Sequence, residues 1–250
     1  MCGRFTLTQD LGYLAERFDF PLPEADYRPA YNTAPTDRVL AVTHDGPRAG
    51  QMLRWGLVPS WAKDDKMPRN TFNARDDRLA SSGMWRGPFK RSRGVVPATG
   101  FFEWKKADGT KQPVYITPKD DQGFTFAAVY DSWINEHGET VESCAIVTTG
   151  PNDFMASIHD RMPAILDEET VALWLDPSTT EADSLQHILV PSPGELMKAH
   201  PVSTRVNSYK NDDAELIKSV SAQDADTGPR QLVFSDSENS PQNTPDRPGK

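Results

Sequence analysis

Cysteine is nearly absent from this sequence, since Cys2 and Cys144 are the only two among 250 residues. So few thiols exclude the small secreted domains that disulfides hold together, and we expect Cys144, inside an apolar run, to be a buried strand residue. Long apolar segments are missing as well. No run approaches the roughly 18–20 residues of a membrane span, and the start of the chain lacks a signal-peptide pattern. We therefore expect a cytoplasmic protein with no membrane partner.

The motifs that announce a bound metal or nucleotide are also missing. The sequence contains no paired Cys-x-x-Cys ligands, no phosphate-binding P-loop and no Gly-x-Gly-x-x-Gly turn. It shows no internal repeat either. We expect a protein without metal or cofactor that acts as a monomer.

Positive charge is scarce overall, with a net charge of −9, but it is unevenly distributed. Residues 1–100 carry 15 Lys and Arg against 11 Asp and Glu, whereas residues 101–250 carry 12 against 25. Between residues 66 and 93, eight basic residues stand against Asp76 and Asp77 alone. This basic segment has two interpretations, a phosphate-binding surface for nucleic acid or an ordinary solvated face. The sequence leaves both open.

Strand patterns fill the middle of the chain and helical patterns its second half. Short β-rich runs separated by Gly, Pro and Asp predict strands at residues 39–43, 52–58, 94–96, 101–104, 114–117, 124–133 and 144–149. Helical spacing of apolar residues predicts helices at 11–18, 168–175, 182–189 and 213–220. Without regular βαβ alternation, the fold class is α+β, with a largely antiparallel sheet or barrel flanked by short helices.

The composition changes near residue 221. We interpret residues 2–220 as one domain and residues 221–250, which are acidic and rich in Ser and Pro, as a disordered tail. Within the tail, the run Gln231-Leu232-Val233-Phe234 is a weak candidate for docking a replication or repair protein.

The most informative residue is Cys2. A small second residue allows Met1 to be trimmed, and we expect a mature chain that begins with a thiol and a free α-amine on one residue. Their reference pKa values, about 8.5 for the thiol and about 7.7–8.0 for the amine, leave both partly reactive near neutrality. Such a 1,2-aminothiol condenses with an aldehyde to an imine and then closes a thiazolidine ring. The alternative is an incidental small residue.

Three polar or aromatic segments have the composition of a binding site. The run from Tyr31 to Thr36, which includes Asn32 and Pro35, is predicted to be a turn too polar for the core. Trp61 follows a strand and a proline, and it is either a platform on which a base stacks or a core residue. Asn73 and Arg75 lie two residues apart, so on an extended strand they would share a face and bind a sugar and a phosphate.

Two further segments supply groups that transfer protons. Glu103 lies inside the aromatic run Gly100-Phe101-Phe102-Glu103-Trp104, where burial would raise its pKa and suit it to general acid–base chemistry. The alternative is an exposed edge-strand carboxylate. His159 lies between apolar Ile158 and the charged pair Asp160-Arg161, a setting that none of the other four histidines shares. Together with Cys2 these residues form a set of nucleophile, acid–base and proton-shuttle groups.

Six motifs, in order along residues 2 to about 219, resemble the SOS-response-associated peptidase (SRAP) family. They are Met1-Cys2-Gly3-Arg4-Phe5, Tyr31-Asn32-Thr33-Ala34-Pro35, Asn73-Ala74-Arg75, Gly100-Phe101-Phe102-Glu103-Trp104, Ile158-His159-Asp160-Arg161-Met162-Pro163 and Val202-Ser203-Thr204-Arg205-Val206-Asn207.

The resemblance implies a sensor that crosslinks covalently to abasic sites in single-stranded DNA during the DNA damage (SOS) response. It implies that Cys2 forms a thiazolidine with the opened deoxyribose, Asn73 positions it, Glu103 handles protons, and His159 assists ring opening. Arg4 and Arg75 would bind phosphates, with Asn32, Pro35 and Trp61 as further DNA contacts. The resemblance also implies autoproteolytic cysteine peptidase activity and weak lyase activity. In a prokaryote we expect the protein at the nucleoid.

Two other classes of function remain open from the sequence. In an N-terminal-nucleophile amidase or peptidase, Cys2 would attack an amide and its own amine would be the base, which requires an oxyanion hole. In a non-covalent DNA-binding module, Cys2 would be structural and intact and abasic strands would bind alike. The basic segment, together with Arg4 and Arg75, favours a polyanionic substrate over a small amide.

Overall fold

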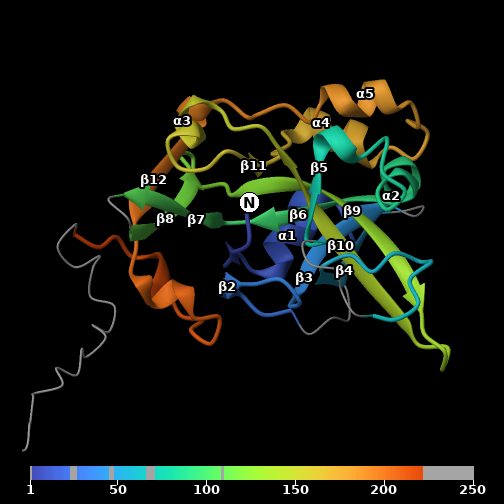
Figure 1. Cartoon of the computed structure of the whole chain (residues 1–250), viewed down its shortest axis with the longest axis horizontal. Coiled ribbons are helices and arrows are strands. Elements are labelled where there is room, and N and C mark those ends of the chain that lie inside the picture. Colours follow the sequence, from blue (N-terminus) through green and yellow to red (C-terminus); the bar gives the residue numbers. More distant parts are fainter. Residues whose placement is uncertain (1, 23–26, 45–47, 66–70, 108–109, 222–250) are drawn as a thin grey trace, which may run out of the picture.

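The computed structural model describes residues 2–22, 27–44, 48–65, 71–107 and 110–221. Short helices cover the edges of two β-sheets (Figure 1). The strands of the described residues are β1 (Phe5–Leu7), β2 (Ala30–Thr33), β3 (Arg38–His44), β4 (Arg48–Trp55), β5 (Asn73–Arg75), β6 (Arg93–Ala98), β7 (Gly100–Ala107), β8 (Thr110–Pro118), β9 (Phe124–Ile134), β10 (Thr140–Thr149), β11 (Met162–Pro163) and β12 (Met197–Pro201). The helices are α1 (Leu11–Phe18), α2 (Arg86–Arg91), α3 (Asp153–Ala156), α4 (Glu168–Leu175) and α5 (Ala182–His187), with 3₁₀ turns at η1 (Asp76–Arg78), η2 (Gly194–Leu196), η3 (Thr204–Asn207) and η4 (Ala214–Ile217).

Five strands close into a barrel. Strand β10 pairs with β4, β4 with β3, β3 with β6, β6 with β9, and β9 returns to β10. Every pairing in this ring is antiparallel except β10 with β4. The second sheet has the order β12-β8-β7-β1-β2 and is antiparallel throughout. The predicted α+β fold with a largely antiparallel barrel is confirmed.

The second sheet is joined to the barrel through β1. The ring of Phe5 packs edge-on against Trp55, with centroids 5.1 Å apart, and against Phe126 at 6.2 Å. All three side chains are buried. Because β1 is fixed in this way, the residues just before it, Cys2 and Arg4, are held at the junction of the two sheets.

Gly100 on β7 leaves room for the ring of Tyr115 on β8, which reaches across to β1. A Cβ at this position would lie 2.6 Å from the ring of Tyr115, so no larger residue fits without displacing it. The Tyr115 hydroxyl in turn makes a 2.7 Å hydrogen bond with Oγ1 of Thr6. This packing sets the register in which Phe101 faces Phe5, and it places Glu103 two residues further along β7.

Helix α1 forms as predicted. The side chain of Asp10 accepts a 2.9 Å hydrogen bond from the Tyr13 N–H and caps the first turn. Asp19 ends the helix in the left-handed conformation at φ 54°. Leu14 and Phe18 are buried, as the helical spacing predicts.

Three predicted elements are wrong in detail. The strand predicted at 52–58 ends at Trp55, because Gly56 adopts φ 132° and turns the chain away. The helix predicted at 213–220 is only the 3₁₀ turn η4, after which Ser219 pairs with Val202. The polar run predicted as a turn from Tyr31 begins instead as strand β2, in which Asn32 is buried. The tail from residue 222 lies outside the described residues.

Candidate functional site

Cys2 lies directly before β1, and its side chain is fully buried. The side-chain amide of Asn73, the first residue of β5, donates a 2.9 Å hydrogen bond to the main-chain oxygen of Cys2. Burial raises the pKa of the Cys2 thiol, and the negative charge of Glu103 raises it further. The thiol is therefore neutral at physiological pH, and it needs a proton acceptor before it can act as a nucleophile.

Glu103 provides a carboxyl group at this position. Glu103 lies on β7 and is 2 % exposed, and this burial raises the pKa of its carboxyl. The positive charge at the amino terminus and that of His159 act in the opposite direction and lower it. The sequence expectation of a buried Glu103 with a raised pKa is confirmed, and a carboxyl of this kind can both accept and return a proton.

His159 follows α3 and reaches the same site, as its electrostatic effect on Glu103 indicates. Its side chain is 27 % exposed, and Nδ1 lies 2.9 Å from a carboxylate oxygen of Asp160. The same Nδ1 lies 3.0 Å from the main-chain N–H of Arg161. A neutral ring accepts from Arg161, whereas a protonated ring donates to Asp160, so each protonation state has a partner. The structure thus brings Cys2, Asn73, Glu103 and His159 together.

An ion pair that the sequence analysis did not single out ties the His159 loop to η1, the turn that follows β5. Nη2 of Arg161 lies 2.7 Å from Oδ1 of Asp76, and both side chains are less than one-fifth exposed. Thr149 donates a 2.9 Å hydrogen bond to Oδ2 of the same Asp76, and Arg161 also donates to the main-chain oxygen of Thr148. The adjacency of Arg161 to His159 was the available signal, but nothing in the sequence identifies Asp76 as its partner.

Arg4 and Asn32, both predicted to contact DNA, are joined by a hydrogen bond. Nη1 of Arg4 donates to Oδ1 of Asn32 at 2.8 Å and to the main-chain oxygen of Val206 at 2.9 Å. The Asn32 amide donates to the main-chain oxygens of Ser208 and Asn211, at 3.0 and 2.8 Å. Asn32 is buried and Arg4 half-buried. The contacts that they make in this structure therefore hold a segment near the C-terminal end of the domain.

Arg75 lies at the end of β5 and is exposed, whereas Asn73 at its start is buried. The extended strand that carries both residues is confirmed. Their surroundings differ, because Asn73 is inside the protein and Arg75 is in contact with solvent. The Arg75 guanidinium makes two hydrogen bonds to Asp77, of 3.0 and 2.8 Å, and both side chains are about half exposed. This pairing raises the pKa of Arg75 and lowers that of Asp77. Asp77 competes with any phosphate that approaches Arg75.

Trp61 is 66 % exposed, which excludes the interpretation that it is a core residue. Its loop is anchored from both sides, because the Ser60 N–H donates to Asp131 at 2.8 Å and the Trp133 indole donates to the main-chain oxygen of Ala62 at 2.7 Å. Pro35 is half-buried, just before the turn at Thr36 where φ is 87°. A fixed backbone with an exposed ring is suited to stacking.

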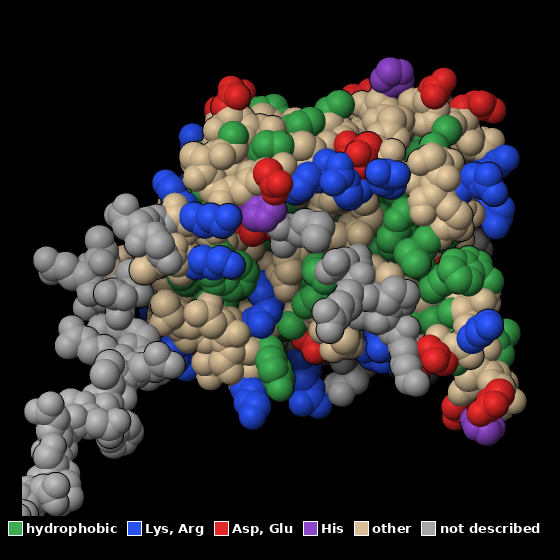
Figure 2. Space-filling model, viewed as in Figure 1, with side chains coloured by type: hydrophobic (Ala, Val, Ile, Leu, Met, Phe, Trp, Pro, Cys, Tyr) green, Lys and Arg blue, Asp and Glu red, His purple; other side chains and the backbone are tan. Residues whose placement is uncertain are grey.

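The basic segment of residues 66–93 is not one surface. Arg93 is 5 % exposed, and its guanidinium donates to five main-chain oxygens, those of Phe89, Lys90, Trp174, Asp176 and Thr179. Arg93 therefore stabilises the packing of α2 and α4 and is no candidate for binding phosphate. Lys66 and Arg69 lie outside the described residues. On the face shown in Figure 2, Lys and Arg side chains gather around the region where the chain begins in Figure 1.

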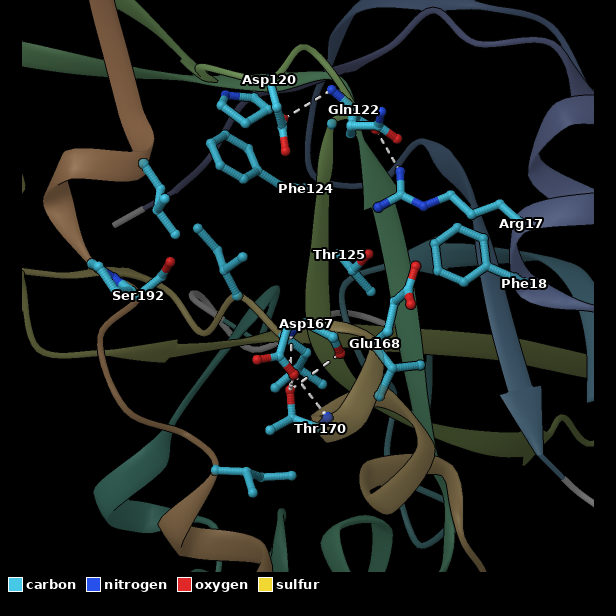
Figure 3. Close-up of a pocket in the computed structure, with 18 of the residues that line it drawn as sticks. Arg17, Phe18, Asp120, Gln122, Phe124, Thr125, Asp167, Glu168, Thr170 and Ser192 are labelled. Carbon is cyan, nitrogen blue, oxygen red and sulfur yellow. Dashed lines mark hydrogen bonds between the residues drawn. The ribbon is translucent and has the colours of Figure 1, made fainter.

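A groove lies away from these residues. It runs between α1, the turn from β8 to β9 and the segments that flank α4, and Figure 3 shows Phe18, Phe124 and Glu168 in its lining. Neither Cys2 nor any other predicted site residue lines it. Its Asp167 and Thr170 form the N-terminal cap of α4, so their polar groups already serve the helix.

Within the described part of the chain, no group of three or more His, Cys, Asp or Glu side chains could hold a metal ion. The candidate site therefore consists of a thiol, a carboxyl, an imidazole and an amide. None of the described helices has the length and apolar character of a membrane-spanning segment.

The structure therefore combines a five-stranded barrel and a second sheet with a buried cysteine at the second position of the chain and a buried glutamate. The chain belongs to the SOS response associated peptidase (SRAP) family, whose model matches residues 1–209. The resemblance seen in the sequence motifs is confirmed.

Several relatives are similar to the chain over most of their length. The chain is 43 % identical to the abasic site processing protein YoqW of Bacillus subtilis over 224 residues, which cover 88 % of this chain and all of that protein. It is 35 % identical to the abasic site processing protein HMCES of Gallus gallus, covering 78 % of this chain and 68 % of that protein. A crystal structure of a Bacteroides thetaiotaomicron protein has a TM-score of 0.78 at 28 % identity, covering 88 % of this chain and all of that one.

Proposed function

We propose that this protein processes abasic sites in single-stranded DNA by forming a covalent crosslink through Cys2. One observation carries the proposal: the buried Cys2 is held by Asn73 beside a buried Glu103 whose pKa is raised. An abasic site carries an aldehyde and no base, so its recognition requires a nucleophile and backbone contacts rather than a base-reading pocket. The similarity to proteins named for abasic site processing supports this substrate.

The reaction begins at the α-amine, which removal of Met1 would free. The amine nitrogen attacks the C1′ aldehyde of the opened deoxyribose, and the resulting carbinolamine loses water to give an imine. Glu103, whose raised pKa favours the protonated carboxyl, supplies the proton that the leaving hydroxyl needs. A C=N double bond replaces the C=O double bond, and the carbonyl oxygen leaves as one water.

The thiol then closes the ring. The departure of water with the Glu103 proton leaves a positively charged, protonated imine and a Glu103 carboxylate. Because the pKa of the Cys2 thiol is raised, it starts protonated, and its proton passes to this carboxylate as sulfur adds to the carbon of the protonated imine. The nitrogen ends as the neutral amine of a five-membered thiazolidine. Asn73 contributes by fixing the main chain of Cys2, so that amine and thiol both face one carbon.

His159 is assigned to opening the sugar ring, a step that requires a proton at the ring oxygen. Contacts of Nδ1 with both Asp160 and the Arg161 N–H support this role, because a protonated ring donates to Asp160 and a neutral ring accepts from Arg161. The same group would act in the reverse reaction.

Exposure and charge support Arg75 and Trp61 as DNA contacts, whereas Arg4, Asn32 and Pro35 are assigned from the family motifs. Arg75 and Arg4 would bind phosphates next to the lesion, and the exposed Trp61 would stack on a base. Asn32 supports Arg4, and Pro35 would shape the surface against which the strand bends. A single strand can bend into such a site without the cost of unpairing a duplex.

The experiment that tests the proposal uses the amino terminus itself. The wild-type chain and a chain with one uncleaved residue before Cys2 are mixed with an abasic oligonucleotide, and the products are separated by denaturing electrophoresis. We expect an adduct from the wild type and none from the extended protein, because its α-amine no longer belongs to Cys2. An undiminished adduct from a verified extended protein, folded as judged by circular dichroism, contradicts the proposal.

A further inference from the structure

An arm of residues 204–217 lies beside the candidate site. The residues that hold it are sequence neighbours of the two groups that carry the proposed chemistry. Arg4, two residues after Cys2, donates to the main-chain oxygens of Val206 and Asn207. Trp104, the residue after Glu103, donates from its indole to Oδ1 of Asn207 at 2.8 Å. The arm is therefore bound to the segment that leads from Cys2 into β1, and it covers the face of β7 that carries Phe102 and Trp104, opposite the face of Glu103.

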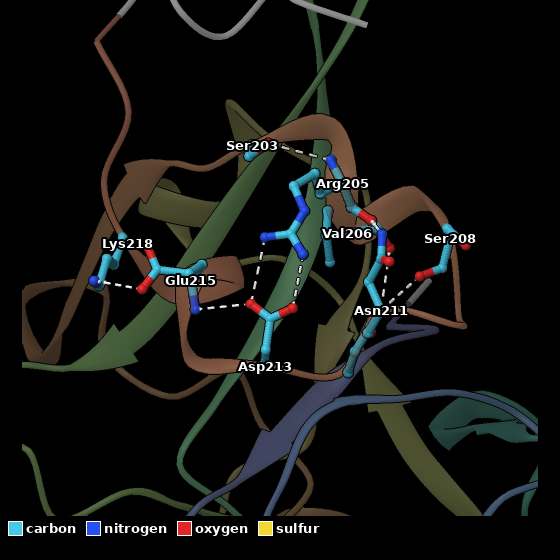
Figure 4. A network of polar contacts seen from close by, with 9 residues as sticks. Ser203, Arg205, Val206, Ser208, Asn211, Asp213, Glu215 and Lys218 are labelled. Carbon is cyan, nitrogen blue, oxygen red and sulfur yellow. Dashed lines mark hydrogen bonds and ion pairs between the residues drawn. The ribbon is translucent and has the colours of Figure 1, made fainter.

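The arm is also braced internally, as Figure 4 shows. Arg205 and Asp213 form an ion pair with a shortest distance of 2.7 Å, and Asn211 donates to the main-chain oxygen of Arg205 at 2.7 Å. The Asn211 N–H closes the turn 208–211 on the oxygen of Ser208 at 3.2 Å. The Asn32 amide binds the main-chain oxygens at both ends of this turn. This ion pair and these hydrogen bonds hold the turn in one conformation.

The apolar side chains of the arm fall into two groups. Val206 and Leu216 are fully buried and pack with Phe102 and Tyr115 in a small core. Tyr209, at the tip of the braced turn, is 68 % exposed, more than any other large hydrophobic side chain among the described residues. Its neighbour Lys210 is exposed as well. The arm therefore has its own core and does not use Tyr209 to fill it.

We propose that Tyr209 stacks on an unpaired base of the DNA strand next to the abasic site, with Lys210 close to the adjoining phosphate. This inference rests on the proposed function, because it takes single-stranded DNA as the ligand. An exposed ring on a fixed backbone loses little conformational freedom when a base stacks on it, and stacking suits any sequence.

The position of the arm supports two-sided binding. In the view of Figure 1 the arm, coloured orange to red, and the loop after β4 lie on opposite sides of strand β3. A strand that crosses the site would meet one aromatic ring on each side of the reacting sugar. The hydrogen bonds of Arg4 and Asn32 would then also contribute to DNA binding, because they fix the backbone of the arm that carries Tyr209.

The test uses a single-stranded oligonucleotide with a tetrahydrofuran abasic analogue, which has no aldehyde and cannot crosslink. A fluorescent 2-aminopurine is placed on the 5′ side of the analogue in one probe and on the 3′ side in another. Binding affinity and fluorescence quenching are measured for wild type, Tyr209→Ala and Tyr209→Phe. Tyr13→Ala is the matched control, because Tyr13 is an exposed tyrosine that lines the separate groove.

We expect Tyr209→Ala to weaken binding by roughly 5- to 100-fold, the range for one lost base stack, and to lose the quenching of one probe but not of the other. Tyr209→Phe retains the ring and should keep both properties, as should Tyr13→Ala. If Tyr209→Ala binds and quenches like wild type, the inference is wrong. The proposed function is tested by a different experiment. It fails if the wild-type protein forms no adduct with an oligonucleotide that contains a true abasic site.

Discussion

The side-chain amide of Asn73 donates a 2.9 Å hydrogen bond to the main-chain oxygen of Cys2, across 71 positions of sequence. Both residues are buried, and they come from different sheets, since Cys2 precedes β1 and Asn73 begins β5. The bond holds the first residues of the chain against the barrel. Residues near the start of a chain are often poorly ordered, whereas here Cys2 is buried and hydrogen-bonded.

Replacing Asn73 should therefore slow the crosslinking reaction while the protein still folds. We expect Asn73→Ala to slow adduct formation by about 10- to 100-fold, because the reacting groups of Cys2 are no longer aligned. The lost hydrogen bond of a buried carbonyl should lower the free energy of unfolding by about 1–3 kcal/mol. The rate is followed on denaturing gels and the stability by urea unfolding. A folded Asn73→Ala protein that crosslinks at the wild-type rate shows that the bond has no part in positioning.

Glu103 should make stability depend on pH. Because burial raises the pKa of its carboxyl, the folded protein keeps a proton that the unfolded chain has already lost. Stability from this group is therefore full at acidic pH and decreases as the pH rises from the unfolded pKa through the folded one. We expect Glu103→Gln to remove this decrease and to be more stable than wild type at pH 7.5, with a smaller difference at pH 4.

The same substitution should abolish the proton transfers of crosslinking. Glu136→Gln serves as the control, because Glu136 has an 87 % exposed side chain and should change neither property. Unfolding by urea at the two pH values measures the stability difference. A difference that shrinks as pH rises contradicts the assignment of a raised pKa to Glu103.

Substitutions of Arg75 and Asp77 should change the affinity for single-stranded DNA in opposite directions. Arg75→Ala should weaken single-strand binding and reduce the magnitude of the salt slope by roughly 0.7, the value for one lost phosphate contact. Asp77→Asn removes the carboxylate that competes for the guanidinium, so affinity should increase. Binding is measured by fluorescence anisotropy over a range of salt concentrations, with Arg17→Ala in the separate groove as control. Equal slopes in all four proteins would move the phosphate contact elsewhere.

Much of the fold and of the candidate site could be predicted from the sequence, because these features depend on residues close together in the chain. The strands of the barrel followed from apolar runs between turn residues, and the burial of Glu103 followed from its aromatic neighbours. Cys144 is buried in β10, as its apolar run predicts. The grouping of Cys2, Asn73, Glu103 and His159 followed from the family motifs rather than from their spacing along the chain.

The sequence could not supply contacts between distant segments. Arg93 counts as a positive charge in the basic segment, yet the structure buries it against main-chain oxygens of α2 and α4. Arg4 meets Val206 across 202 positions, and Asp76 meets Arg161 across 85. Strand β2 looked like a polar turn because its Asn32 is polar, and that side chain is buried only because the arm of residues 204–217 supplies its acceptors.

Exchanging the thiol of Cys2 for a hydroxyl should separate its two nucleophiles. Cys2→Ser keeps the α-amine, and trimming of Met1 still accepts serine, so the imine should form. The hydroxyl closes the ring poorly, because its pKa is far above that of a thiol. We expect little heat-stable adduct from Cys2→Ser but an adduct that borohydride traps, since reduction converts the imine to a stable amine.

An imine that stays open can eliminate phosphate, so Cys2→Ser should also nick the strand more than wild type does. Adding Glu103→Ala should suppress the trapped species by slowing proton transfer. A correctly processed Cys2→Ser protein whose adduct survives heating as well as that of wild type excludes the thiazolidine.

The most direct measurement is the chemical state of Cys2 in the adduct. The wild-type protein is crosslinked to an abasic oligonucleotide without borohydride, treated with iodoacetamide under denaturing conditions and digested with nuclease and trypsin. Mass spectrometry then examines the peptide Cys2-Gly3-Arg4. We predict that it carries the sugar remnant with the loss of one water and that its sulfur is not alkylated, because the thiazolidine occupies both amine and thiol. A sugar remnant on any other peptide, or an alkylated Cys2 that still carries the sugar, contradicts the account.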